Sequence, residues 1–226
     1  MKFNMACIRL FEGIKYVLPI LHPNKKRLAL IMCPEEDSAS VEWARQKDEN
    51  WVNKDITSLE FENIEFQHAS NNKYFMNADK SFTLESVSFV NCDFIGLTRG
   101  FWRHQQATSK HIMNFEVEGC RFDKCGWQTG SYGLVDLRSF NDPTSYDQID
   151  KAVFRNCTFS RDNDGTAGFG WGNLFYAPYV DKPIQLEFKN ITIYNYSLNK
   201  RLINISSAVG SELTIEGMVL ASPSGD

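Results

Sequence analysis

One eight-residue pattern recurs six times and constrains the fold more than any other feature of the chain. It reads apolar, any, apolar, any, Asn or Gly, apolar, any, apolar. Its copies are LEFENIEF (59–66), VSFVNCDF (87–94), FEVEGCRF (115–122), AVFRNCTF (152–159), LEFKNITI (186–193) and LTIEGMVL (213–220). The fifth positions are 28, 28, 37, 34 and 27 residues apart. A repeat of about 30 residues predicts a repeat architecture.

The spacing of apolar residues inside the pattern predicts a bend. Leu59 and Phe61 share one face of a strand, and Ile64 and Phe66 share a face of opposite parity. All four can face one core only if the chain turns between them. Such a turn needs a residue in the left-handed region, which Gly occupies freely and Asn better than most. The fifth column therefore predicts a corner ladder of Asn63, Asn91, Gly119, Asn156, Asn190 and Gly217.

A third apolar segment follows most of these corners. The segments are YFMN (74–77), GFWRH (100–104), GLVDLR (133–138), NLFYA (173–177) and RLINI (201–205). Three short strands per repeat, each stacked on its copies, predict an all-β parallel β-helix of at least six rungs. Equivalent side chains should then form columns. The column after the corner holds Ile and Met beside Cys92, Cys120 and Cys157, which indicates core packing of free thiols rather than redox chemistry.

Two other folds share part of this pattern. Leucine-rich repeats have the period and an Asn column, but their Asn lies three residues beyond the second apolar position, and here it lies two beyond. They also need a helical half-repeat, which is not visible. A β-sandwich leaves the Asn/Gly column unexplained. The parallel β-helix is the fold that accounts for all six copies.

The chain divides at the start of the repeats. Residues 1–55 lack the pattern and are expected to form an irregular N-terminal cap and the first rung or rungs, with strands from RLALIMC (27–33) and SVEWARQ (40–46). Residues 56–226 are expected to form the β-helix. The closing ASPSGD shows no capping pattern, so we expect the helix to be incomplete at this end, because an open rung exposes unpaired backbone and apolar core.

Composition narrows the range of functions. A net charge of -4 gives no electrostatic reason to expect nucleic acid as a partner. No apolar run approaches the ~20 residues of a membrane span, and the N-terminus shows no signal-peptide pattern. The six cysteines are too sparse for a disulfide scaffold and lack the spacing of a zinc site, so no metal site is predicted. The oligomeric state is left open.

The three-strand rung with an Asn corner resembles the right-handed parallel β-helix of the pectin-lyase-like superfamily. The phrases VSFVNCDF and AVFRNCTF are similar to pectate-lyase-like domains of secreted bacterial surface proteins, and the likeness covers about residues 56–220. It implies a secreted or surface-attached protein that acts on polysaccharide, with a groove beside the strand after the Asn corner. In lyases of this superfamily, acidic residues on that strand hold calcium and an Arg or Lys acts on the sugar proton.

Residues that match this groove strand are the candidates for catalysis. Asp136 and Arg138 are two apart and thus on one strand face, and Arg103 lies one rung earlier. An acid beside arginines could bind a uronate or position a base, and calcium would be the cofactor if the domain is a lyase. However, calcium usually takes several oxygen ligands, and this strand offers one carboxylate. A salt bridge between stacked rungs explains the same residues.

Aromatic residues before the same strand are the candidates for binding. They lie in WQTGSYG and GFGWG, whose glycines leave the rings accessible, and planar rings suit the apolar side of a sugar. The predicted carbohydrate contacts are Trp127, Tyr132, Phe169 and Trp171, together with His104. Alternatively, these rings cover rung surface. We therefore expect an extracellular polysaccharide-binding domain. A polysaccharide lyase or glycoside hydrolase, and a structural stalk or adhesin segment, are the alternatives.

Overall fold

A computed structural model of the chain describes thirteen segments. They are residues 27–31, 39–42, 58–67, 74–78, 81–97, 100–104, 109–125, 133–137, 147–160, 173–178, 182–195, 202–205 and 209–221. For residues 27–31, 39–42, 67, 77 and 147 the description covers the backbone.

The described segments form three sheets, here called A, B and C. Sheet A contains β1 (Arg27–Ile31), β3 (Ser58–Glu62), β6 (Phe82–Val90), β9 (Lys110–Glu118), β12 (Asp147–Arg155), β15 (Gln185–Lys189) and β18 (Glu212–Glu216). Sheet B contains β2 (Ala39–Glu42), β4 (Ile64–Gln67), β7 (Asp93–Ile95), β10 (Arg121–Asp123), β13 (Thr158–Ser160), β16 (Thr192–Tyr194) and β19 (Val219–Ala221). Sheet C contains β5 (Tyr74–Ala78), β8 (Gly100–His104), β11 (Gly133–Leu137), β14 (Asn173–Tyr176) and β17 (Ile203–Asn204).

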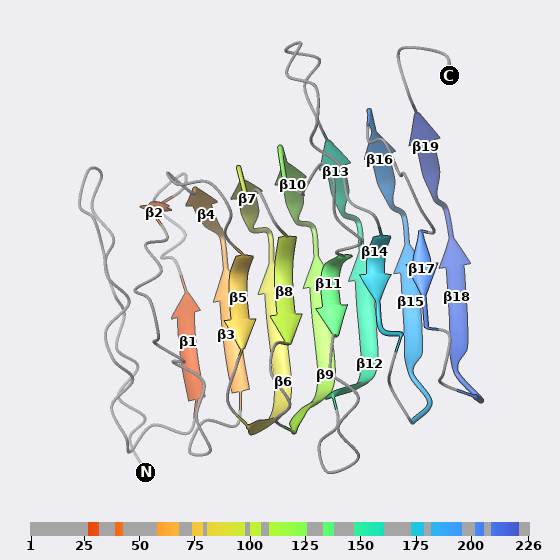
Figure 1. Ribbon diagram of the computed structural model, residues 1–226. Coiled ribbons are helices and arrows are strands. Elements are labelled where there is room, and N and C mark those ends of the chain that lie inside the picture. Colours follow the sequence, from red (N-terminus) through yellow and green to blue (C-terminus); the bar gives the residue numbers. More distant parts are fainter. Residues whose placement is uncertain are drawn as a thin grey trace.

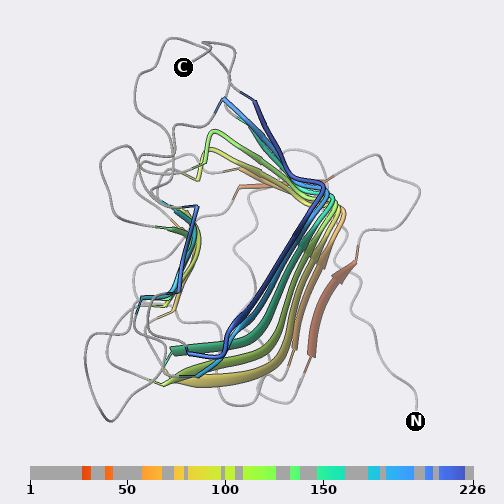
Figure 2. The same ribbon diagram turned by 90° about the vertical axis from the view of Figure 1, so that its right-hand side faces the viewer.

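The strands wind as a coil. From β3 onward the chain visits sheets A, B and C in turn, and each strand pairs in parallel with its equivalent one rung away. Figure 1 shows the rungs side by side from β1 to β18, and Figure 2 looks along the stack, where the strands superpose as three walls. The fold is a right-handed parallel β-helix, so the predicted fold class is confirmed. Segments 27–31 and 39–42 add β1 to sheet A and β2 to sheet B.

The corner between sheets A and B has the predicted backbone. The φ angles are +56° at Asn63, +51° at Asn91, +63° at Gly119, +54° at Asn156, +54° at Asn190 and +64° at Gly217. The backbone N–H of each corner residue from 63 to 190 donates to the carbonyl just before the next corner, for example Asn91 to Glu118 at 2.8 Å. In the Asn156–Asn190 pair the side chains also bond, with Asn190 Nδ2 donating to Asn156 Oδ1 at 3.0 Å. The left-handed conformation at this column is thus confirmed.

A second left-handed corner ends the sheet B strands, and sequence analysis did not find it. Gly96, Lys124 and Asn195 have φ angles of +71°, +51° and +55°, and each lies five residues after a residue of the first corner. Their N–H groups likewise donate to the neighbouring rung, as Lys124 does to the Ser160 carbonyl at 3.1 Å. The column escaped notice because one member is lysine, which the left-handed region does not favour.

Aromatic columns fill the interior. Phe66, Phe94, Phe122 and Phe159 occupy one register position of sheet B and form a continuous stack with centroid spacings of 5.2, 4.9 and 4.9 Å. This spacing matches the strand separation, so parallel in-register pairing places each ring on the next. All four rings are buried. The stack therefore follows directly from repeating Phe at one position of the pattern.

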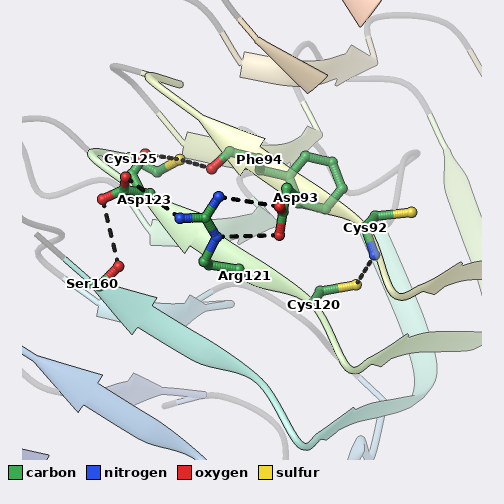
Figure 3. Close-up of polar contacts among 8 residues, drawn as sticks. All are labelled: Cys92, Asp93, Phe94, Cys120, Arg121, Asp123, Cys125 and Ser160. Carbon is green, nitrogen blue, oxygen red and sulfur yellow. Dashed lines mark hydrogen bonds and ion pairs between the residues drawn. The ribbon is translucent and has the colours of Figure 1, made fainter. Parts of the chain in front are cut away.

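The cysteine column is buried and reduced, as core packing requires. Cys92, Cys120 and Cys157 are free thiols, and each Sγ donates to the carbonyl two residues before it, at 3.2 to 3.3 Å. Cys125 makes the same contact at the second corner, with Asp123 at 3.3 Å (Figure 3). Burial raises the pKa of Cys157 and of Cys125 to about 12, so both stay protonated at neutral pH.

Replacing a corner Asn tests the backbone requirement. Asn156→Val should lower the free energy of unfolding by about 1–2 kcal/mol, because a β-branched side chain disfavours φ of +54°. Asn156→Gly should remain closer to the parent protein, because Gly takes this conformation freely. Urea unfolding measures both. Equal losses in the two variants would contradict a conformational role for this column.

The second corner offers the opposite change. Lys124→Gly should raise the free energy of unfolding by up to about 1 kcal/mol, because it relieves the φ of +51° at a non-glycine residue. The matched control is Lys151→Gly, because Lys151 lies within strand β12 and should lose stability on the same change. Thermal unfolding measures both, and a destabilised Lys124→Gly variant would show that its side-chain contacts outweigh the strain.

Candidate functional site

The outer face of sheet C is the candidate site. Along the helix axis this sheet forms a separate wall across the interior from the corner that joins sheets A and B (Figure 2). Its strands are the ones predicted to lie beside the groove. The outer side of the sheet carries polar residues that are unusually buried. Segments 126–132, 138–146 and 161–172, which connect its strands to the rest of the coil, lie outside the described residues.

A local bend in each sheet C strand determines which side chains face outward. Two consecutive residues of a strand belong to the core, as Phe101 and Trp102 do in β8. Beyond this pair alternation resumes, so a residue flanked by two core residues faces outward. The outward residues form a register column of Asn77, Arg103, Asp136, Tyr176 and Asn204, of which Asn77 is placed by its backbone. One polar position is thus repeated over five strands.

A second column lies at the start of the same strands. It contains Tyr74, Gly100, Gly133 and Asn173, which precede the first core residue of each strand. A Cβ at Gly100 would lie 2.8 Å from the Tyr74 ring, and one at Gly133 would lie 2.8 Å from the Tyr176 Cβ. The same Cβ atoms would also meet backbone carbonyls, those of Gly133 and Val135. The glycines therefore allow the close approach of neighbouring backbone and of the Tyr74 ring.

Arg103 and Asp136 occupy the centre of this surface. Their backbones are neighbours in register on β8 and β11, and the Arg103 guanidinium lies 5.3 Å from the centroid of the Tyr74 ring. This is within the range of a cation–π interaction. Arg103 is 8% exposed and Asp136 is fully buried. An arginine, a carboxylate and a tyrosine ring are therefore concentrated on one covered patch of sheet C.

Two amides on this face have unsatisfied atoms. Asn173 is 2% exposed, and its Nδ2 makes no hydrogen bond in the part of the chain that the structure describes. The Oδ1 of Asn204, in register with Tyr176, is also buried and accepts no hydrogen bond there. A buried amide without a partner costs about 1–3 kcal/mol. One unsatisfied donor and one unsatisfied acceptor therefore lie on adjacent strands, β14 and β17.

The structure brings together part of the predicted catalytic set. Arg103 and Asp136 are adjacent in register, as their one-rung separation in the sequence indicates. Strand β11 ends at Leu137, so Arg138 lies outside the described residues. The same is true of the predicted aromatic contacts Trp127, Tyr132, Phe169 and Trp171. Their roles remain predictions.

His104 lies in the core, which corrects its placement on the ligand surface. It is 0% exposed, and its Nε2 accepts a hydrogen bond of 3.0 Å from Trp102 Nε1. Its ring also packs edge-on against Phe82. Because Phe101 and Trp102 both face the core, the alternation of side chains after them is shifted by one residue. His104 therefore faces inward, whereas in a straight strand it would face the side opposite Phe101. Burial, followed by the charge of Lys110, lowers the pKa of His104 well below its ordinary value.

Sequence reasoning missed Tyr74, Tyr176 and Asn173 as members of this face. Tyr74 and Tyr176 fall inside apolar segments and read as core, although Tyr74 contacts Arg103 and Tyr176 is partly exposed. The signal that could have identified them is the pair of consecutive apolar core residues in β5, β8, β11 and β14. Such a pair places polar side chains on the same outer side both before and after the bend.

Other site types are not found among the described residues. In the thirteen segments, no group of three or more His, Cys, Asp or Glu side chains is placed to hold a metal ion. Within the same segments no helix is long and apolar enough to cross a membrane. Comparisons with protein-family models, with curated proteins and with solved structures gave no match. The geometry of sheet C therefore carries the functional argument alone.

The buried His104 predicts acid sensitivity. The unfolded chain binds a proton near pH 6.5, whereas the folded protein resists it, so stability falls as pH drops below 6.5 and continues to fall until the folded His104 is protonated. His104→Gln retains a hydrogen-bond acceptor for Trp102 and does not titrate. Urea unfolding between neutral pH and mildly acidic pH should show a smaller loss in this variant. If the free energy of unfolding falls equally with pH in both proteins, the acid sensitivity does not come from His104.

Proposed function

We propose that this protein is a carbohydrate-binding parallel β-helix domain whose ligand surface is the outer face of sheet C. The observation that carries the proposal is the pair of unsatisfied buried amide atoms on adjacent strands of sheet C, Asn173 Nδ2 in β14 and Asn204 Oδ1 in β17. Native structures seldom leave such atoms without a partner unless something else satisfies them. A ligand with both donors and acceptors would satisfy the pair.

Sugars match the chemistry of this face. Each hydroxyl group can donate and accept, so a chain of sugars can bond to an amide N–H and an amide oxygen on adjacent strands. The apolar side of a sugar ring packs on planar aromatic side chains, and Tyr176 on this face is partly exposed. Arg103 and Asp136 add a charged donor and a charged acceptor. A repeating column over five strands suits a chain of sugars.

The connecting segments provide further aromatic residues. Trp127 and Tyr132 precede β11 in the sequence, and Phe169 and Trp171 precede β14. Their proposed role is to bind the sugar through their aromatic rings. The whole domain would then belong to a secreted or surface-attached protein of the pectin-lyase-like type. This assignment is supported by the three-strand rung and the left-handed Asn corners.

A lyase or hydrolase is the second candidate. It is favoured by one observation, the fully buried Asp136 next to Arg103 in register. A carboxylate and a guanidinium side by side are groups that general acid–base catalysis uses. Arg138 would be the third member and calcium the cofactor in a lyase. The experiment below separates this candidate from binding alone.

A glycan array, with and without calcium, should identify the bound oligosaccharide, and titration calorimetry should then measure its affinity. Asn173→Ala and Asn204→Ala should each weaken binding about three- to tenfold, because each removes one hydrogen bond to a neutral hydroxyl. Trp127→Ala and Trp171→Ala should also weaken it. The control is Asn114→Ala, which makes the same change at an exposed position of sheet A.

Three results distinguish the functions. Binding that is lost in the sheet C variants and kept in the control supports the proposal. If the parent protein also shortens the bound polysaccharide, and Asp136→Ala or Arg138→Ala binds without cleaving, the domain is an enzyme. A blank array, or binding that none of the sheet C variants weakens, overturns the proposal, and a blank array favours the structural stalk.

A further inference from the structure

The C-terminal rung exposes positions that are buried in the other rungs whose side chains the structure describes. Leu213 and Ile215 in β18 are 46% and 48% exposed, whereas Leu186 and Phe188, their register partners in β15, are 2% and 1% exposed. Leu220 in β19 is 61% exposed, although its partner in β16 is buried. The core columns therefore continue to this end without a covering layer among the described residues.

This end also has free backbone edges. Strands β18, β19 and β17 are each the last strand of their sheet, so one edge of each has no strand partner in the described part of the chain (Figure 1). Large exposed apolar side chains concentrate here, since four of the seven among the described residues lie in β18 and β19. An apolar patch beside open strand edges is characteristic of an interaction surface.

The first rung of the same chain has apolar residues at the register positions that would pair with this surface. Inside the molecule every rung adds to the next in parallel and in register, and β1 occupies the same register columns as β18. Continuing the columns from β18 to β1 of a second copy places Leu28 opposite Leu213 and Leu30 opposite Ile215. The same operation places Val41 of β2 opposite Leu220.

The charges at the strand ends favour the same partner. The column that ends at Glu212 has Arg27 as its first member, so head-to-tail stacking pairs opposite charges across the new contact. A tail-to-tail dimer has to pair β18 with its own copy in antiparallel. The register that matches Leu213 with Ile215 then opposes Glu212 and Glu216, and like charges directly opposite each other destabilise a strand pair.

We propose that copies of this chain associate head to tail, with β1 and β2 of one copy adding in parallel to β18 and β19 of the next. The contact repeats the internal rung-to-rung interface and uses different surfaces on the two partners. Such a heterologous contact does not close on itself unless the rotation allows a ring, so it generates open stacks. This inference does not depend on the proposed carbohydrate function.

Sedimentation velocity of the full chain over a range of concentrations tests the association. Glu212→Arg and Arg27→Glu should each weaken it about tenfold, because each replaces an opposite-charge pair with a like-charge pair. An equimolar mixture of the two variants should recover association, because each new contact then has opposite charges. The matched control is Glu85→Arg, which makes the same charge change at an exposed position in β6.

The outcomes are decisive in both directions. Concentration-dependent stacks that both variants weaken, that the mixture restores and that Glu85→Arg leaves unchanged support the proposal. A monomer at millimolar concentration overturns it, as would follow if the N-terminal cap expected from the sequence covers β1. Association that Arg27→Glu does not affect also overturns it, because a tail-to-tail dimer does not use β1. Circular dichroism of each variant confirms that it is folded.

Discussion

The structure depends on one backbone conformation, the left-handed turn at the fifth position of each repeat. This turn lets the apolar pairs on both sides face the same interior although their parity differs. Each corner N–H also bonds to the neighbouring rung, so the turn and the stacking reinforce one another. The Phe66–Phe159 stack and the buried thiols follow from it, because only identical turns place identical side chains above one another. Moving one corner by a residue would shift the register of every column beyond it.

The corner could be predicted because its chemistry is restricted to two residue types. Only Asn and Gly occur at that column, and both suit a positive φ. The second corner could not, since Lys124 lies between Gly96 and Asn195 in its column and lacks that chemistry. Its left-handed conformation is supported by the hydrogen bond of its N–H to the neighbouring rung. Local preference is informative only where it agrees with the tertiary structure, and at Lys124 it does not.

The candidate site was predicted in part for the same reason. Arg103 and Asp136 could be paired from the repeat period, which fixes register. His104 was placed on the wrong side, because two consecutive core residues in β8 reverse the alternation that a straight strand would follow. Such bends leave Tyr74 and Asn173 on the outer side of sheet C, the side of Arg103 and Asp136. The outward side chains of this sheet are thus determined by small departures from regular alternation, which strict alternation does not predict.

The repeats are constant in one part and variable in length in another. The octapeptide has a fixed length in all six copies, while the distance between successive corners varies from 27 to 37 residues. This variation falls in the sequence between the sheet B and sheet C strands and between the sheet C and sheet A strands. The sheet A strands differ in where they begin and not in where they end before the corner. Insertions can therefore enlarge or reshape the surroundings of the polar column without disturbing the coil. The chain can therefore change in length around sheet C while its repeating scaffold stays constant.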